Sequence, residues 1–471
     1  MVSSYALLVE DEVGPAEDVT QILNDCGFDV VLFDSYQGVM DGLASISRPI
    51  DVVILDRRLP RISTDEPTEQ VGDDLLEELL DMLPDTPFVV FTGYTSFEHS
   101  QFVTGDRGII EVGGPLEHMD RVKPFKKGQT LELKAYLEKI SSYVYAMNDI
   151  EIADVDTVPP DGPQRRLLRR ICWFYGGAKI RAKSLLGGLT ESSVWECEIF
   201  DSQHQPAASI VVKVSTVSKK TPAGGFHNLL PASFVAAPGA VISGLCGGAR
   251  VQVLQLVGRA PVSLLQLIAS DELRAAEALR SLSAVIIESI NGHATAVNLR
   301  DLVEPLISWE RLIELLTEAH LPVPRPTIKI SSRMAPQHGD LHPGNILIAG
   351  QSPVLIDFDS EVLGGRPLDA LTALLSPIFH RDSPIREHVW PNATQCSAIG
   401  TDDFLVGCPC PAWVEVAQAW VRQTVTSPRE QWGLILGFAV RQLKYPDVIS
   451  SEVLAVRAKA FAEAALQKLL E

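Results

Sequence analysis

Acidic and amide side chains stand in the second half of the chain at a spacing that suits phosphoryl transfer. Asp340 is followed five residues later by Asn345, and Asp357 ends the apolar run 353–356. A site that transfers a terminal phosphoryl group must position a hydroxyl, hold magnesium and spread negative charge. We therefore expect Asp340 to orient or deprotonate the hydroxyl. Asn345 and Asp357 supply the oxygen ligands that Mg²⁺ prefers.

The segment 337–359, which reads QHGDLHPGNILIAGQSPVLIDFD, resembles the catalytic and metal-binding loops of the aminoglycoside and choline phosphotransferase family. The resemblance implies that His338 holds the loop through backbone hydrogen bonds. It also gives Asp369, in the segment GRPLDAL, a structural role as a brace of the catalytic loop. The short interval between Asp357 and Asp369 favours a small-molecule hydroxyl over a peptide as the substrate.

Three short runs of strand-forming residues, 178–186, 193–200 and 208–214, precede this segment. Their order fits the small ATP-binding lobe of a kinase, with Gly187 and Gly188 in the first turn and Lys213 inside the third run. This resemblance implies that Lys213 reaches the α- and β-phosphates of ATP and that the two glycines lie against the nucleotide. ATP and Mg²⁺ are the implied cofactors.

One feature of the small lobe leaves two functions open. Active kinases pair the strand lysine with a glutamate, but no Asp or Glu occurs between Val214 and Ser270. If His227 or Asn228 replaces the acid, this half is an ATP-dependent phosphotransferase acting on a small molecule. Otherwise it is a pseudokinase that senses nucleotide or binds protein partners in a bacterial signalling or conflict system. The sequence does not decide whether this half is an enzyme.

A second set of polar residues follows apolar runs near the N-terminus. Glu10 and Asp11 follow the run 6–9, Asp56 follows 52–55, and Thr92 follows 88–91. Such runs, alternating with helical stretches, predict a doubly wound parallel sheet whose site lies at the carboxyl ends of its strands. Acids gathered there can hold Mg²⁺ while one carboxylate accepts a phosphoryl group.

Residues 1–145 resemble a response-regulator receiver domain. The resemblance implies a partner histidine kinase and the following roles: Glu10, Asp11 and Asp56 as metal ligands, Asp56 also as phosphoacceptor, Thr92 as switch hydroxyl, and Lys123 before Pro124 as phosphate-binding lysine. The family's usual aromatic switch residue would lie three positions before Lys123, where this chain has Asp120. Insertions are expected at 63–70 and 104–120, beside the phosphorylation edge.

These observations predict four segments: a flavodoxin-like α/β receiver at 1–148, a linker at 149–165, a kinase-like small lobe at 166–265, and a large lobe at 266–471. The last two form an α+β, two-lobed kinase-like domain. Helical periodicity is expected over 129–148 and 272–320. The C-terminal residues 411–471 are expected to be helical, with Trp413, Trp420 and Trp432 in the core.

The charge, hydropathy and cysteine content of the chain argue against a nucleic-acid-binding, membrane or secreted protein. The net charge is −20, and residues 1–150 hold 28 of the 60 acidic residues but only 11 of the 40 basic residues. Neither half shows a basic stripe, which argues against nucleic-acid binding. The chain has no apolar stretch or leader typical of membrane insertion or secretion, and its seven cysteines are scattered. We expect a cytoplasmic protein with reduced, buried thiols.

Overall fold

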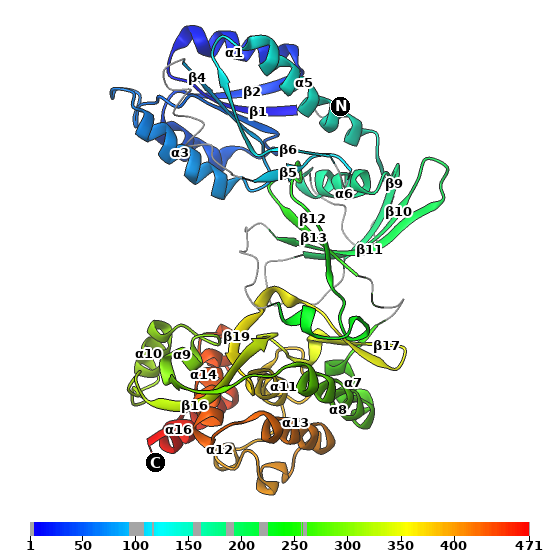
Figure 1. Cartoon of the computed structure of the whole chain (residues 1–471), viewed down its shortest axis with the longest axis vertical. Coiled ribbons are helices and arrows are strands. Elements are labelled where there is room, and N and C mark those ends of the chain that lie inside the picture. The colour runs from blue at the N-terminus through cyan, green and yellow to red at the C-terminus, as the bar shows by residue number, and fades with distance from the viewer. Residues whose placement is uncertain are drawn as a thin grey trace. The chain divides into compact units, whose positions relative to one another are not determined.

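The computed structural model describes residues 4–93, 108–114, 117–153, 162–184, 193–215, 225–255, 257 and 261–470. The chain divides into two compact units (Figure 1). Unit 1 comprises Met1–Lys219 and Pro238–Leu256, and unit 2 comprises Lys220–Ala237 and Val257–Glu471. Most of the segment expected to form a small kinase lobe, 166–265, therefore groups with the receiver-like residues in unit 1.

Unit 1 begins with a five-stranded parallel sheet. Its order is β2 (Phe28–Phe33), β1 (Ser4–Val9), β3 (Val52–Leu55), β4 (Phe88–Thr92) and β7 (Val122–Lys126). The strand order reverses between β1 and β3, which is the topological switch point of a flavodoxin-like fold. This arrangement confirms the doubly wound parallel sheet predicted for the N-terminal part of the chain.

The strands of this sheet are buried on both faces. Ala6 and Leu8 of β1 pack in one core with α1 (Val13–Asp25) and α5 (Thr130–Asn148), whereas Leu7 and Val9 pack in another. The second core includes residues of α2 (Tyr36–Gly42) and α3 (Glu69–Met82). Alternate side chains of a strand point to opposite faces, so helices are needed on both. Figure 1 shows α1 and α3 on opposite sides of the strands.

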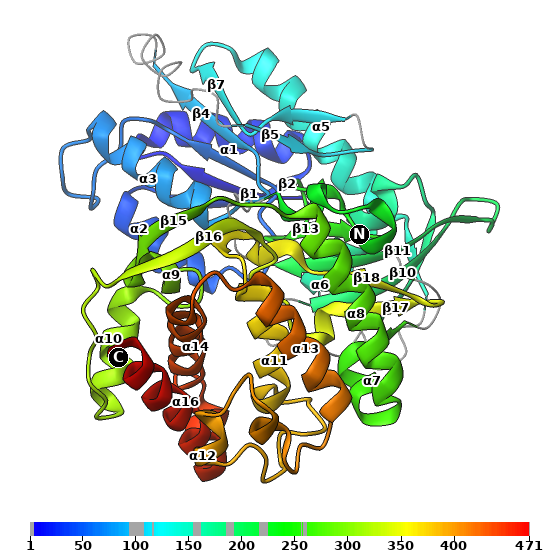
Figure 2. The same ribbon diagram turned by 60° about the horizontal axis from the view of Figure 1, so that its bottom comes forward.

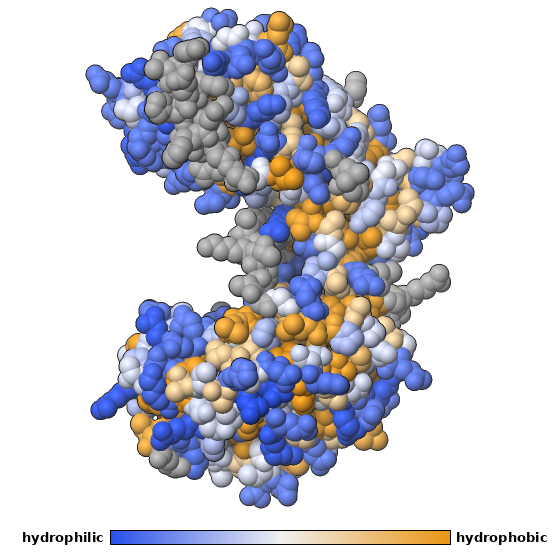
Figure 3. Space-filling model, in the orientation of Figure 1, coloured by the Kyte–Doolittle hydropathy of each residue, from blue (hydrophilic) through white to orange (hydrophobic). Residues whose placement is uncertain are grey.

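The outer surface of α3 is acidic. Its leucines at positions 75, 76, 79 and 80 are buried, while Asp74, Glu77, Glu78 and Asp81 are exposed. This spacing gives an amphipathic helix with one apolar and one charged face. The charged face contributes to the hydrophilic surface over this part of unit 1 (Figure 3). Part of the acidic excess in the first 150 residues is thus accounted for by the solvent-exposed face of α3.

A second sheet completes unit 1. Its order is β12 (Pro238–Ile242), β13 (Arg250–Leu254), β11 (Pro206–Ser215), β10 (Ser193–Phe200), β9 (Lys179–Ser184) and β8 (Glu151–Ile152). The three runs that the sequence indicated as strands appear as β9, β10 and β11. Helix α6 (Gly162–Phe174) buries Leu168 and Ile171 in the core of this sheet. β8 lies within the residues that we expected to be a linker.

Buried polar contacts join the two sheets of unit 1 at the amino-terminal ends of β3 and β4. Asp51, before β3, forms an ion pair with Arg166 of α6 at 3.0 Å. Asp85, before β4, accepts hydrogen bonds from the Gly248 amide at 3.0 and 3.1 Å. Leu245, in the turn between β12 and β13, packs in the core shared by α1 and α5. The receiver-like part and the second sheet are therefore packed as one body.

Asp85 should make the stability of unit 1 depend on pH. Burial raises the pKa of Asp85 from 3.8 to about 6. Because this pKa is higher in the folded state than in the unfolded chain, the contribution of Asp85 is fully present below pH 3.8 and is lost as the pH rises through 6. The asparagine variant D85N cannot ionise. We expect the unfolding free energy of D85N, measured by urea denaturation and taken relative to wild type, to rise by up to roughly 3 kcal/mol between pH 3 and pH 7. A difference that is constant across this range would contradict the expectation.

Unit 2 is mainly helical around one large core. Its helices are α7 (Leu264–Ser270), α8 (Glu272–Ser289), α9 (Leu299–Val303), α10 (Trp309–Glu318), α11 (Leu368–Phe379), α12 (Ala393–Cys396), α13 (Pro411–Thr424), α14 (Pro428–Gln442), α15 (Pro446–Ile449) and α16 (Glu452–Leu470). Every residue of α11 is buried, and α13 and α14 pack against it (Figure 2). Trp413, Trp420 and Trp432 are buried in this core, as predicted.

Two small antiparallel sheets complete unit 2. One has the order β14 (Val262–Ser263), β17 (Ile346–Ala349) and β18 (Ser352–Leu355); the other has β15 (Ala294–Asn298), β16 (Lys329–Gln337) and β19 (Val362–Gly365). Helices with small antiparallel sheets fit the kinase-like fold predicted for this part of the chain. Six of the seven cysteines are buried and Cys408 is half-buried. Among the described residues, no helix combines the length and apolar character needed to cross a membrane.

Candidate functional site

Three acids meet at the carboxyl edge of the parallel sheet. Glu10 and Asp11 follow β1, and Asp56 follows β3. The two strands pair in parallel with Val9 beside Leu55, so the residues that follow them emerge at the same edge. Single ligand atoms from the three carboxylates all lie within 4.8 Å of one another. The structure therefore brings together the three residues that the sequence assigned to a metal.

A lysine completes this cluster, and it is Lys127 rather than Lys123. The Lys127 ammonium lies 2.7 Å from Asp56 Oδ2 and 2.8 Å from Glu10 Oε2. Lys123 pairs with Val89 in the middle of the β4–β7 ladder. Its ammonium lies 5.5 Å from the ring centre of Phe125 and 5.0 Å from that of Tyr136. The assignment of Lys123 as the phosphate-binding lysine is therefore wrong for this structure.

The register of β7 explains the correction. Three residues lie between the two lysines, so the lysines are about 13 Å apart along an extended chain. Only Lys127 follows the end of the strand, where the acids lie. Lys123 matches the receiver pattern because it precedes Pro124, but it lies within the strand. Lys127, the last lysine before Gly128 and α5, is the one at the edge where the acids lie.

Thr92 is the last residue of β4 and lies at the same edge. It is 1% exposed, and its carbonyl accepts a hydrogen bond from the Lys127 amide at 3.0 Å. The position three residues before Lys127 is Pro124, and Asp120 lies on the separate strand β6 (His118–Asp120). Neither position holds the aromatic switch residue expected of the receiver pattern.

The electrostatics of the cluster suit a divalent cation. Burial, and then the neighbouring Asp56 carboxylate, raise the pKa of Glu10 from 4.5 to about 7. Burial also raises the pKa of Asp11. Three carboxylates face one ammonium, so a cation with oxygen preference would relieve their repulsion. Glu10, Asp11 and Asp56 fit a Mg²⁺ site by donor type and by spacing.

In unit 2, the loops that carry Asp340, Asn345 and Asp357 are tied to one another. The Asn345 side-chain amide donates to the Asp340 carbonyl at 2.9 Å, and the Ile356 amide donates to the Asn345 carbonyl at 3.0 Å. His338 Nε2 lies 2.9 Å from the Ile356 carbonyl. These contacts hold the loop before β17 against the end of β18, where Asp357 follows.

Asp369 braces the beginning of the same loop. Its carboxylate accepts hydrogen bonds from the backbone amides of His338 at 2.8 Å and Gly339 at 3.0 Å. The carboxyl is 1% exposed, and burial raises its pKa. Gly339 has φ +80°, and a Cβ there would meet the Ser360 carbonyl oxygen at 2.1 Å. A side chain at this position would displace the loop.

Two features of this loop region were not evident from the sequence. Arg441 of α14 lies near Asp340, with 3.6 Å between its Nη2 and Asp340 Oδ1. Nothing in the local pattern around Arg441 indicates this contact, since 100 residues separate the partners. Asp357 adopts φ 62°, in the left-handed region that non-glycine residues rarely occupy. Such strained conformations cluster at functional sites.

The residues assigned to nucleotide binding in the small lobe are partly described. Lys213 lies on β11, opposite Val194 of β10 and Gln252 of β13, and is 8% exposed. Gly187 and Gly188 lie outside the described residues. His227, one candidate for the missing acid, belongs to unit 2, where its Nδ1 lies 2.7 Å from Glu361 Oε1. Its imidazole is thus already engaged by a carboxylate.

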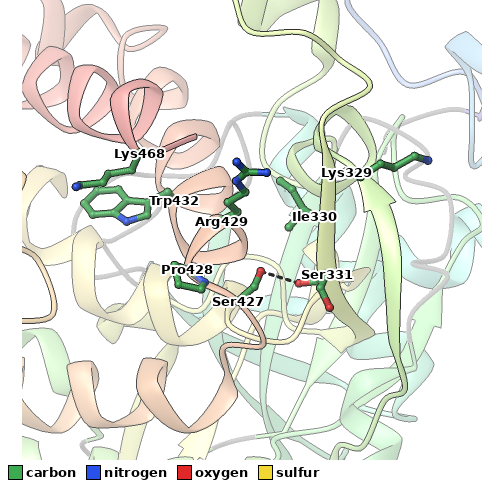
Figure 4. Close-up of a pocket in the computed structure, with 8 residues that line it drawn as sticks. All are labelled: Lys329, Ile330, Ser331, Ser427, Pro428, Arg429, Trp432 and Lys468. Atoms are coloured by element: carbon green, nitrogen blue, oxygen red, sulfur yellow. Dashed lines mark hydrogen bonds between the residues drawn. The ribbon is translucent and has the colours of Figure 1, made fainter. Parts of the chain in front are cut away.

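A pocket of about 650 Å³ opens elsewhere in unit 2, at the start of α14 (Figure 4). It is lined by Lys329, Ile330, Ser331, Ser427, Pro428, Arg429, Trp432 and Lys468. The Ser427 hydroxyl donates to the Ser331 carbonyl at 2.9 Å across its floor. None of the residues assigned to phosphoryl transfer lines this pocket.

Comparison with known proteins supports the second half of the chain as a phosphotransferase-type domain. Residues 253–387 match the model of the phosphotransferase enzyme family, which covers Asp340, Asn345, Asp357 and Asp369. No curated protein matches the chain. Residues 253–387 are therefore similar to the phosphotransferase enzyme family, and they follow the doubly wound, receiver-like sheet of unit 1.

Several solved structures are similar to parts of the chain. A response regulator receiver domain protein from Clostridium thermocellum shares 16% identity over 31% of this chain and 98% of that chain, with a TM-score of 0.24. A CheY-like receiver domain protein from Methanospirillum hungatei shares 19% identity over 31% and 99%, with a TM-score of 0.22. The amicoumacin kinase hAmiN, in complex with AMP-PNP, Ca²⁺ and Ami, shares 15% identity over 60% and 88%, with a TM-score of 0.33.

Proposed function

We propose that the chain is a response regulator that accepts a phosphoryl group on Asp56 in a phosphorelay. The observation that carries this proposal is the cluster of Glu10, Asp11 and Asp56 within 4.8 Å, with the Lys127 ammonium 2.7 Å from Asp56. Carboxylates for Mg²⁺, a carboxylate nucleophile and a cation for the transferred oxygens are the parts that aspartyl phosphorylation needs.

In the proposed reaction, an Asp56 carboxylate oxygen attacks the phosphorus of a phosphohistidine on a partner histidine kinase. The new P–O bond forms as the P–N bond breaks, and the leaving imidazole takes up a proton. Mg²⁺, when bound, neutralises charge on the transferred oxygens. Lys127 would bind one of these oxygens, and Glu10 and Asp11 would hold the metal.

The direct test uses acetyl phosphate as a small donor with the full chain. We expect one phosphoryl adduct that peptide mass spectrometry assigns to Asp56. The adduct should require Mg²⁺ and be removed by hydroxylamine, which cleaves acyl phosphates. An adduct on another residue, or labelling that EDTA does not reduce, would overturn the proposal.

For the second half, we propose Mg-ATP binding and phosphoryl transfer to a small-molecule hydroxyl. The support is the family match over 253–387 and the bonded arrangement of the Asp340, Asn345 and Asp357 loops. Asp340 would take the proton of the hydroxyl as its oxygen bonds to the γ-phosphorus, and ADP would leave. Asn345 and Asp357 would hold the metal. Lys213 would neutralise the α- and β-phosphates.

A pseudokinase output domain is the second candidate. It is favoured by the absence of any acidic residue between Val214 and Ser270 and by the engagement of His227 with Glu361. In this case the domain would sense nucleotide or bind protein partners without turnover. Calorimetric titration of Mg-ATP into the full chain, followed by a turnover assay with candidate hydroxyl acceptors, separates the two functions. Binding without turnover across aminoglycosides, amino alcohols and sugars would favour the pseudokinase.

A further inference from the structure

The amino-terminal edge of the parallel sheet is covered by parts of the second sheet of unit 1. We name the covering segment, residues 243–249 between β12 and β13, the β12–β13 turn. Its Leu245 amide donates to the Asp85 carbonyl at 3.0 Å, and its Gly248 amide donates to the Asp85 carboxylate. Arg166 of α6 reaches Asp51 beside it. Each contact is made to a residue just before β3 or β4.

A buried arginine, Arg170, connects the hairpin that precedes β7 to the β12–β13 turn. Arg170 of α6 is fully buried and donates to the carbonyls of Glu111 at 2.8 Å, Gly113 at 2.9 Å and Gly244 at 2.8 Å. Glu111 ends β5 (Ile109–Glu111), which forms a hairpin with β6 ahead of β7. A guanidinium has five donors and no acceptor, so three carbonyls suit it. Arg170 thus fastens this hairpin to the β12–β13 turn.

The fit between the hairpin and the turn is close. A Cβ on Gly244 would meet the Glu111 carbonyl oxygen at 2.2 Å. The Glu111 amide donates to the Ser243 hydroxyl at 3.4 Å. Because backbone approaches backbone here, a small displacement of the hairpin must be matched by the turn.

Each strand that is held at this edge carries a residue of the candidate phosphorylation site at its other end. β3 lies between Asp51 and Asp56, and β4 follows Asp85 and ends at Thr92. β7 lies between the hairpin and Lys127. The strand β3 spans roughly 17 Å between its two polar residues. The two edges of the sheet are therefore joined by three short, buried strands.

The turn is also continuous with the strand that faces Lys213. β13 begins directly after the turn, and its Gln252 pairs with Lys213 of β11. Both strands belong to unit 1, so this connection runs within one packed body. A displacement of the turn is thereby transmitted to the backbone on which the nucleotide-binding lysine was predicted.

We infer that phosphorylation of Asp56 is read out through the amino-terminal edge of the sheet, by loosening of the β12–β13 turn and Arg170. This inference rests on the proposed phosphorylation of Asp56. A phosphoryl group on Asp56 replaces the present Lys127–Asp56 ion pair with new contacts to Lys127 and Thr92, and this shifts the carboxyl ends of β4 and β7. Their far ends then move away from the turn, which weakens its bonds to Asp85 and to the hairpin. The signal reaches the strand that carries Lys213.

Hydrogen exchange on the full chain tests this inference. Beryllofluoride with Mg²⁺ serves as the phosphoryl mimic on Asp56. The amides of Leu245 and Gly248 should exchange faster in its presence, by about 5- to 150-fold, the usual range of coupling between two sites. The D56N variant should show no such change. Exchange that stays the same or becomes slower at these amides overturns the inference.

Reciprocity provides a second, independent measurement. If the mimic favours the loosened turn, then weakening the Arg170 contacts must tighten binding of the mimic. We expect Arg170→Lys to raise the affinity for beryllofluoride, measured by thermal shift across a titration. Ser243→Ala should do so more weakly. Unchanged affinity in both folded variants overturns the inference.

A matched control exists in the other unit. Arg457 is 2% exposed and donates to the carbonyls of Pro391, Arg386 and His388. Arg457→Lys should therefore cost comparable stability but leave beryllofluoride affinity unchanged. If the mimic gives no Mg²⁺-dependent stabilisation that D56N removes, the proposed phosphorylation itself fails. If it binds at Asp56 but the turn does not respond, only the present inference fails.

Discussion

Replacing Lys127 with alanine should slow phosphorylation of Asp56 by about 10²- to 10³-fold, the usual loss when one donor to a developing oxyanion is removed. The reason is geometric, since the Lys127 ammonium lies 2.7 Å from Asp56 Oδ2. Initial rates of labelling by acetyl phosphate, with peptide mapping of the adduct, measure the effect. The variant should still fold, because Lys127 lies in a surface turn and is about one-quarter exposed.

Lys123→Ala is the matched control for this prediction. Both lysines belong to the same short segment, but Lys123 lies against Phe125 and Tyr136. Its loss should change the labelling rate by less than about threefold, as expected for a residue outside the reacting geometry. A large loss in Lys123→Ala together with near-normal labelling in Lys127→Ala would reverse the assignment.

Asp340→Asn should abolish turnover of a hydroxyl substrate while it preserves nucleotide binding. A general base contributes about 10²- to 10⁴-fold to a rate, and asparagine keeps the size of the side chain. The Asp340 carbonyl, rather than its carboxylate, holds Asn345, so the loop should remain in place. The assay is ADP release with the acceptor that the screen identifies, beside calorimetric titration of Mg-ATP.

Asp357→Ala should show the opposite pattern, because this residue is assigned to the metal. We expect loss of measurable Mg-ATP binding, and a melting curve checks separately that the variant is folded, since Asp357 has a left-handed backbone conformation. Asp402→Ala, an exposed acid of the same unit, is the control and should bind as wild type. If Asp357→Ala binds Mg-ATP normally, Asp357 is not a metal ligand. If the wild-type chain shows no binding, the domain is a scaffold.

The sequence predicted the repetitive parts of the fold well. The apolar run 52–55 is β3, the run 88–91 lies within β4, and the run 193–200 is β10. β3 and β4 have strong local signals, since a buried parallel strand is continuously apolar and ends at a polar residue. The acids Glu10, Asp11 and Asp56 were found for the same reason. β10 is antiparallel and is recognised by the alternation of its apolar and polar residues.

Features set by register or by tertiary contact were not predicted. Lys123 and Lys127 differ only in their position along β7, which depends on pairing with β4. Arg441 meets Asp340 only because α14 packs beside the loop. The grouping of β9 to β13 with the receiver-like sheet depends on buried contacts of Asp51, Asp85 and Arg170, and single residues of this kind leave no periodic pattern.

The covered edge of the parallel sheet limits how this chain can be recombined. A receiver domain grafted from another protein would bring its own phosphorylation edge. It would fit this edge only if it also carried carboxylates at the positions of Asp51 and Asp85 and a hairpin that Arg170 can fasten. A chimaera without that hairpin would leave the buried Arg170 guanidinium with the Gly244 carbonyl but without its acceptors at Glu111 and Gly113. In this chain the parallel sheet and the second sheet of unit 1 should therefore be exchanged together in any chimaera.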